Sequence, residues 1–167
     1  MHISEFLLPE FDLEIKNTKI TLERVPADKP DFAPHPKSTP LGRLAAHVAQ
    51  LPSFGLTILT TPELDFAKGS MKPAKMESAA QLAALLEEGA AKTRSALSAL
   101  PDDAWNEDWK LSMGDKKIFE GSRFLSYREM FLNHLVHHRA QLGIYLRLND
   151  IKVPAIYGPS ADETLGF

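Results

Sequence analysis

The sequence contains no cysteine. This absence excludes disulfides, cysteine-ligated zinc and iron–sulfur sites, and any thiol nucleophile supplied by the protein itself. It also fits a chain kept in a reducing compartment, and we therefore expect a cytoplasmic protein.

Long apolar runs and blocks of basic residues are missing as well. No apolar stretch approaches the roughly 18 residues of a membrane span, and the amino-terminal residues lack the basic-then-apolar pattern of a secretory signal. The net charge is −3, with no cluster of lysines and arginines. Because phosphate binding needs clustered cations, we expect no nucleic-acid partner and no membrane partner. The expected partner is a small molecule.

What the chain does have is the composition of an ordinary globular domain. Apolar residues make up 44% and charged residues 25% of its 167 positions. A chain of this length is able to bury about 70% of its unfolded surface without disulfides. We therefore expect one domain over residues 1–167.

Apolar periodicity predicts four amphipathic helices, at residues 2–25, 39–60, 78–100 and 126–148. The second is expected to begin at Thr39-Pro40, a cap residue followed by proline. Pro9 and Pro52 are expected to bend the helices that contain them or to delay their start. Loops are expected between the helices, with room for a short hairpin around Gly114, and the chain ends in an irregular tail. This pattern predicts an all-α four-helix bundle.

Three histidines interrupt these apolar stripes. His134 and His138 are four residues apart, which places their imidazoles on one helix face, about 5–6 Å apart at Cβ. His47 occupies the same kind of position between Leu44 and Leu51. Buried imidazoles need polar partners, and bundle interiors commonly hold metal ions in this way. We predict a divalent metal on His47, His134 and His138, with one coordination position open. All-nitrogen ligation suits Zn, Ni, Fe or Cu.

The other histidines and the arginine beside them are weaker candidates. His137 lies about 100° from His138 around the helix. We therefore expect it to lie at the surface or to contact a metal-binding histidine without binding the metal itself. His2 and His35 lie in a chain end and a proline-flanked loop, and we do not expect them to be ligands. Arg139 is equally compatible with an anionic substrate and with an ion pair.

Aromatic and acidic residues near the carboxyl terminus allow two interpretations. Trp105 and Trp109 either line a pocket mouth or pack in the core, and the core is favoured. Tyr157 is a candidate general acid, and Asp162 and Glu163 are candidates to orient a ligand imidazole. Packing of the tail onto the bundle is the favoured explanation for all three.

Several segments resemble a known family. The run Asn133–Leu148 (NHLVHHRAQLGIYLRL), with Val153–Glu163 (VPAIYGPSADE) after it, resembles the last helix and tail of the DinB/YfiT-like metalloenzyme family. Shorter similarities lie upstream, at Phe11–Glu14, Leu22–Pro26, His35–Ser38 and Leu41–His47. Two positions depart from the family pattern. Ala140 replaces the usual glycine after the His-Arg pair, and Asn149-Asp150 replaces an apolar–glycine pair at the helix end.

The resemblance implies a four-helix bundle with up-down-down-up connectivity, usually a homodimer. It implies one divalent metal, most often nickel or zinc and less often iron or manganese, held by His47, His134 and His138. Relatives of known activity are thiol-dependent transferases or isomerases that use glutathione-like, bacillithiol or mycothiol cofactors. Neither departure from the family pattern touches these three histidines.

Three hypotheses about function follow. The leading one is a metal-dependent transferase that acts on a small electrophile, with its thiol supplied by a low-molecular-weight cofactor because the chain has none. The second is a metal-dependent hydrolase of small molecules that uses bound water. The third is a non-catalytic dimeric bundle whose metal or buried histidines serve stability alone.

Overall fold

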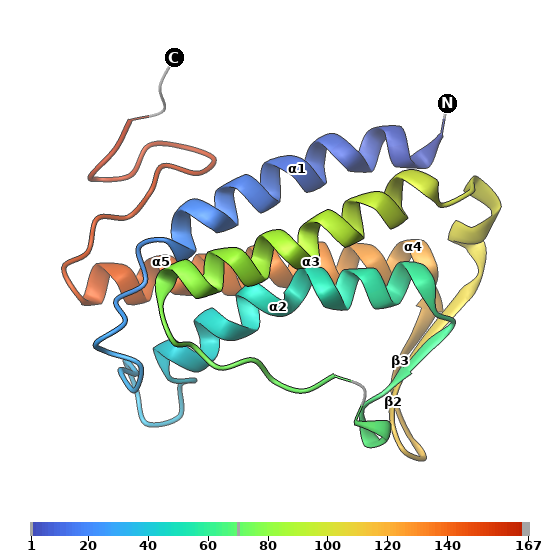
Figure 1. The fold of residues 1–167 in the computed structure, drawn as a ribbon, viewed down its shortest axis with the longest axis horizontal. Helices are drawn as coiled ribbons and strands as arrows, with labels where there is room; N and C mark the ends of the chain where they lie inside the picture. Colours follow the sequence, from blue (N-terminus) through green and yellow to red (C-terminus); the bar gives the residue numbers. More distant parts are fainter. Residues whose placement is uncertain (1, 70, 165–167) are drawn as a thin grey trace.

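The protein is built around four long helices. The computed structural model describes residues 2–69 and 71–164, and its long helices are α1 (Ile3–Leu22), α2 (Leu41–Thr60), α3 (Ala79–Ala99) and α5 (His134–Leu148). Figure 1 shows α2 and α3 running in one direction and α1 and α5 in the other. Their apolar faces meet in one core that includes Phe11, Leu44, Leu86 and Leu142. None of the helices described has the length and apolar character needed to cross a membrane.

A loop rather than a side chain caps the start of α2. This helix begins at Leu41 with no side-chain cap, so the predicted Thr39 cap is wrong. The Leu41 N–H donates to the Phe32 carbonyl and the Gly42 N–H to the Pro30 carbonyl, both at 2.8 Å. The preceding loop therefore satisfies two of the N–H groups that a helix start leaves without a partner.

Two prolines lie inside helices without ending them. Pro9 is within α1, which already begins at Ile3, and Pro52 is within α2. The Thr93 hydroxyl of α3 donates to the Pro52 carbonyl at 2.6 Å, which links the two helices at this point. α3 starts after Ser78, as predicted, and the Ser78 hydroxyl accepts a hydrogen bond from a backbone N–H of the first turn.

A small sheet at one end of the helices makes the all-α prediction wrong. Its strands are β1 (Glu63–Asp65), β2 (Asp108–Met113) and β3 (Lys116–Ser122), in the order β1-β2-β3 (Figure 1). β2 and β3 form the antiparallel hairpin expected around Gly114, whose φ of 58° lies in the region that glycine enters most easily. β1 pairs in parallel with β2.

The strand that the sequence did not predict is β1, in residues 61–77, which were expected to be loop. Three residues are too few to show the alternation that identifies a strand. Leu64 is buried opposite Leu111 of β2. The Asp65 carboxylate accepts hydrogen bonds from the Ala67 N–H at 2.9 Å and the Gly114 N–H at 2.8 Å. Contacts with distant residues therefore create this strand.

The helix predicted over residues 126–148 is not uniform. It consists of α4 (Arg123–Ser126), a π-helical segment η3 (Tyr127–Asn133) and α5. A π-turn holds more residues than an α-turn, so it rotates the side chains that follow it. Phe131 of this segment packs on Gly55 of α2, where an added Cβ would lie 2.8 Å from the ring. The segment ends directly before His134.

Trp105 and Trp109 lie in the core rather than at a pocket mouth. Their exposed fractions are 1% and 0%. The Trp105 ring centroid lies 5.6 Å from that of Tyr127, and the Trp109 centroid lies 5.9 Å from that of Phe54. The two tryptophans therefore join the hairpin region to α2 and η3.

Candidate metal centre

The three predicted histidines converge on one point. His47 projects from the middle of α2, His134 from the first position of α5, and His138 from one turn later. One ring nitrogen from each lies within 4.8 Å of the other two. The His134 Nε2 is 3.3 Å from the His47 Nε2 and 2.8 Å from the His138 Nε2. We call this group the histidine triad.

Hydrogen bonds at the Nδ1 atoms of His134 and His138 determine which of their nitrogens carry lone pairs. The His134 Nδ1 lies 3.2 Å from the Met130 carbonyl, and the His138 Nδ1 lies 2.7 Å from the Gln141 amide oxygen. Because these oxygens only accept, each Nδ1 donates, and each Nε2 of a neutral ring is left as an acceptor. Two acceptors that face each other at 2.8 Å repel one another unless a cation lies between them.

The spacing of the triad also fits a divalent ion. Zinc binds imidazole nitrogen at about 2.0–2.1 Å, and tetrahedral geometry then separates two ligand nitrogens by about 3.3 Å. Two of the three separations, 2.8 and 3.3 Å, are close to that value, and all three nitrogens lie within 4.8 Å of one another. The residues present therefore fit a bound metal of this type. That His47, His134 and His138 bind such an ion stays a prediction.

The surroundings keep all three imidazoles neutral. Partial loss of water around the ring, more than the neighbouring His134, His138 and Arg43, lowers the pKa of His47 to about 4, although the residue is partly exposed to solvent. Burial also lowers the pKa of His134 and of His138, and outweighs their hydrogen bonds to Met130 and Gln141. At neutral pH the triad therefore offers lone pairs rather than protons.

The triad forms part of the lining of a cavity of about 710 Å³. The remaining lining is mostly apolar, and among the residues described no aspartate, glutamate or fourth histidine joins the triad. The other lining residues are Thr39, Arg43, Leu44, Gln50, Leu51, Phe54, Phe66, Met71, Pro73, Ala74, Leu111, Met113 and Met130. A metal bound by the triad would therefore keep a coordination position that faces the cavity and is open to a ligand.

Two glutamines near the triad were not predicted from the sequence. Gln141 holds His138 through its amide oxygen, and its amide nitrogen lies 3.1 Å from the His137 Nε2. Gln50 donates to the Lys72 carbonyl at 2.7 Å and accepts from the Ala74 N–H at 3.0 Å, so it fastens the segment that forms one cavity wall. Each glutamine follows a triad histidine by three residues, and this spacing was the available signal.

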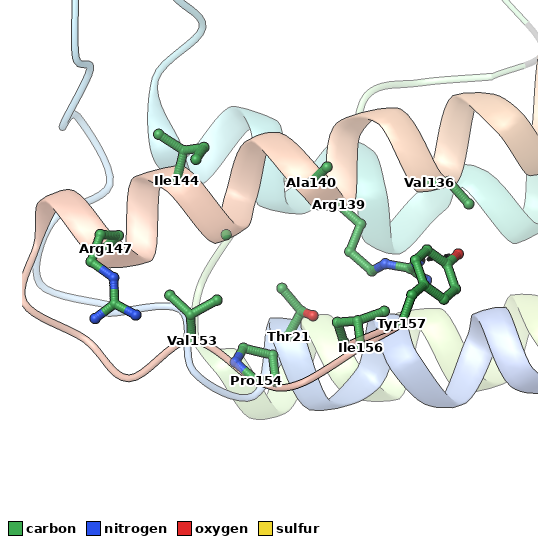
Figure 2. Close-up of a pocket in the computed structure, with 11 residues that line it drawn as sticks. Thr21, Val136, Arg139, Ala140, Ile144, Arg147, Val153, Pro154, Ile156 and Tyr157 are labelled. Atoms are coloured by element: carbon green, nitrogen blue, oxygen red, sulfur yellow. Dashed lines mark hydrogen bonds between the residues drawn. The ribbon is translucent and has the colours of Figure 1, made fainter. Parts of the chain in front are cut away.

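Arg139 and Tyr157 lie away from the triad. The buried Arg139 guanidinium forms an ion pair with Glu14 and contacts the Thr18 hydroxyl. The Tyr157 hydroxyl donates to Glu14 at 2.6 Å and accepts from Arg139 at 2.7 Å. Figure 2 shows Arg139 projecting from α5 toward Tyr157 of the tail, beside a separate groove of about 320 Å³. We call Glu14, Thr18, Arg139 and Tyr157 the Arg139 clamp. Neither Arg139 nor Tyr157 lines the metal cavity.

The two acidic tail residues fasten the tail rather than orient an imidazole. Asp162 forms an ion pair with Arg147 and accepts from the Val153 N–H at 2.8 Å. Glu163 forms an ion pair with Arg24 at 2.6 Å. The tail therefore packs on α1 and α5, as favoured from the sequence.

The remaining histidines stay outside the triad. His2 lies 3.3 Å from the Asp102 carboxylate, beside the start of α1. His35 accepts a hydrogen bond from the Lys37 N–H within its loop. His137 stacks edge-on against His138, with 4.9 Å between ring centroids. This placement agrees with the sequence expectation for each of them.

Comparison with known proteins identifies relatives of this architecture. Residues 10–142 match the DinB superfamily. A DinB-like protein from Bacillus cereus ATCC 10987 superposes with a TM-score of 0.67 at 18% identity, covering 92% of this chain and 97% of that one. The DinB-like protein YjoA from Bacillus subtilis gives a TM-score of 0.66 at 15% identity, covering 88% and 94%. At these identities the likeness extends to the fold alone. No curated protein matches the sequence.

Proposed function

The chain belongs to the DinB superfamily, and from that premise we propose that it is a divalent-metal-dependent enzyme that joins a low-molecular-weight thiol to a small electrophile. The observation that carries the proposal is the convergence of three imidazole nitrogens on the wall of a cavity with no carboxylate among its lining residues. The choice of thiol chemistry rests on the family resemblance and on the missing cysteine.

In this proposal the residues of the chain hold the metal ion and orient the imidazoles that bind it, and none of them attacks the substrate. A divalent ion on the triad would lower the pKa of a thiol or water molecule beside it. The Met130 carbonyl and the Gln141 amide keep two Nε2 atoms directed at the ion. Because the imidazoles are neutral and none of the described lining residues is acidic, the protein would not offset the charge of a bound ion.

The sulfur must come from a separate molecule, because the sequence has no cysteine. In a conjugation the thiol gives up its proton, a sulfur–carbon bond forms, and the electron pair displaced on the electrophile takes up a proton. Within the described part of the chain, the lining residues include no lysine and no carboxylate. Both protons are therefore expected to exchange with water in the open cavity.

Metal content followed by conjugation rate tests the proposal. The protein is purified without chelator or nickel resin, analysed for metals, loaded with Zn²⁺, Ni²⁺ or Mn²⁺, and assayed with a panel of low-molecular-weight thiols and a small electrophile. We expect one ion per chain and a rate that His138→Ala loses and His137→Ala retains. A protein that takes up none of these ions overturns the proposal.

The same experiment separates the two alternatives. Turnover of ester or amide substrates without thiol conjugation would replace the transferase with a hydrolase. A metal that raises thermal stability but supports no turnover would favour the non-catalytic bundle. The homodimer that the family resemblance implies is a further proposal, which molecular mass in solution tests.

A further inference from the structure

Among the residues that the structure describes, Arg43 is the one formally charged residue in the lining of the cavity beside the triad. Arg43 precedes His47 by four residues on α2, so the two side chains lie on the same helix face. Both side chains also line the same cavity. A permanent cation therefore stands beside the proposed metal site.

Arg43 differs from every other arginine in its lack of a partner. Within residues 2–69 and 71–164, no carboxylate lies within ion-pair distance of Arg43. Each of the other arginines forms an ion pair with an aspartate or glutamate: Arg24, Arg94, Arg123, Arg128, Arg139 and Arg147. The sequence contains 22 acidic residues, so a lack of carboxylates does not explain why Arg43 is unpaired.

The charge balance of the cavity favours an anionic ligand. A metal on three neutral imidazoles keeps its positive charge, and Arg43 adds another one turn away. Arg43 is itself exposed to solvent, and uncompensated cations that line an open cavity attract anions to it. The planar guanidinium is suited to a carboxylate, which it binds through two parallel hydrogen bonds.

The walls of the cavity favour an apolar body on the same ligand. Leucine and phenylalanine side chains cover the α2 side, and three methionines, Met71, Met113 and Met130, come from three other segments. Methionine side chains are flexible and polarizable, and they adapt to ligands of varied shape. A volume of about 710 Å³ lies within the range of about 300–1,000 Å³ that is typical of small-molecule sites.

We propose that this cavity binds a small organic acid with an apolar body and that Arg43 selects it. The carboxylate of the ligand binds to Arg43, and its thiol or other donor group is directed at the histidine triad. The part of this inference that concerns the donor group near the metal rests on the proposed function. Arg43 is a specificity-determining residue in this scheme and takes no part in bond making.

Matched thiols separate the two ends of the ligand. We would titrate 6-mercaptohexanoate and 6-mercaptohexanol into the Zn²⁺-loaded and the chelator-treated protein by calorimetry, because the two probes differ only in the carboxylate. The acid is expected to bind the wild type about tenfold more tightly than the alcohol, the fold-change that corresponds to about 1.4 kcal/mol. Arg43→Gln should remove that difference, and Arg43→Lys should restore part of it.

The controls distinguish failure of this inference from failure of the proposed function. Arg94→Gln removes an exposed arginine that pairs with Asp12, and it should leave the binding of both probes unchanged. Zn²⁺ titration of each variant reports on the triad alone, since Arg43 is not a ligand. If Zn²⁺ does not bind, the proposed function fails, and the acid–alcohol difference in metal-free protein still decides the role of Arg43. Equal affinities for acid and alcohol, or an Arg43→Gln protein that still prefers the acid, would overturn the inference.

Discussion

His138 and Arg139 are neighbours in the sequence, yet they belong to polar clusters of opposite kinds. In the Arg139 clamp, a buried cation meets a buried carboxylate, and a threonine and a tyrosine hydroxyl contribute further bonds. In the histidine triad, the Nε2 atoms of His134 and His138 are both acceptors and face each other at 2.8 Å in the wall of a cavity. The clamp is complete without a ligand, and the triad is not.

This difference indicates a structural role for the clamp and makes the triad the candidate binding site. A buried polar group that finds all its partners inside the protein contributes to a defined tertiary structure. Acceptors that face each other without a donor do not stabilise the fold, and such groups mark a candidate binding site. Both clusters interrupt apolar helix faces, so the interruption alone does not distinguish them.

The largest expected effect comes from breaking the clamp. Glu14→Ala leaves the Arg139 guanidinium buried without its carboxylate, and loss of one partner of a buried pair costs about 3–5 kcal/mol. We expect the free energy of unfolding to fall by this amount in urea titrations of metal-free protein. Glu10→Ala is the matched control, because its pair with Arg128 is partly exposed and such pairs contribute about 1 kcal/mol or less. Similar losses in both variants would show that the clamp is not a buried structural pair.

Breaking the triad should act on metal binding instead. His134→Ala removes the ligand between the other two, and we expect metal affinity to fall more than about 100-fold, or about 2.7 kcal/mol. His137→Ala should change it little, because this ring lies outside the triad. Competition against a chromophoric chelator measures both constants. Equal losses in the two variants would mean that the ligand set is wrongly chosen.

A smaller effect is expected from the residue that orients His138. Gln141→Ala removes the acceptor of the His138 Nδ1 hydrogen, and loss of such an outer contact typically lowers metal affinity by about 10–100-fold. Gln141→Glu retains an acceptor oxygen and should preserve affinity. Were the alanine variant to bind metal as the wild type does, the triad would not depend on this hydrogen bond.

The smallest effect is expected from a modest change of pH. Protons compete with a metal for imidazole nitrogen, and a lowered pKa moves that competition to lower pH. Because the pKa of His47 is about 4 and those of His134 and His138 are also below their usual value, affinity should hardly change between pH 8 and about 6.5, the ordinary histidine pKa, and should fall below it. A fall in affinity centred near pH 6.5 or above would contradict the lowered pKa values.

In the metal-free protein, protonation of these histidines should appear as a change in the free energy of unfolding with pH. A histidine whose pKa is lower in the folded state binds more protons when unfolded, so the free energy of unfolding rises with pH. The contribution of His47 is complete above about pH 6.5 and is lost as the pH falls toward 4. The difference between wild type and His47→Gln in the midpoint of thermal unfolding, followed across this window, isolates that contribution.

The helices and the three histidines could be predicted because their signals are local. A stripe of apolar residues reports which face of a helix is buried, and a histidine in that stripe is visible whatever the stripe packs against. The hairpin at Gly114 was predictable for the same reason, since a short turn is recognised from adjacent residues. The strand β1 and the segment η3 were not, because both depend on partners that are far away in the chain.

The sequence by itself therefore determined which positions interrupt the apolar faces and that any reactive thiol must be external. Only the tertiary structure decided that Arg139, and not the adjacent His138, is paired with an opposite charge. Glu14, which pairs with Arg139, is 125 residues distant in the chain, and whether a carboxylate comes close to Arg43 depends on how whole helices pack. Helical periodicity gives the direction of a side chain along its own helix, whereas charge compensation depends on three-dimensional distances between elements, which no local pattern contains.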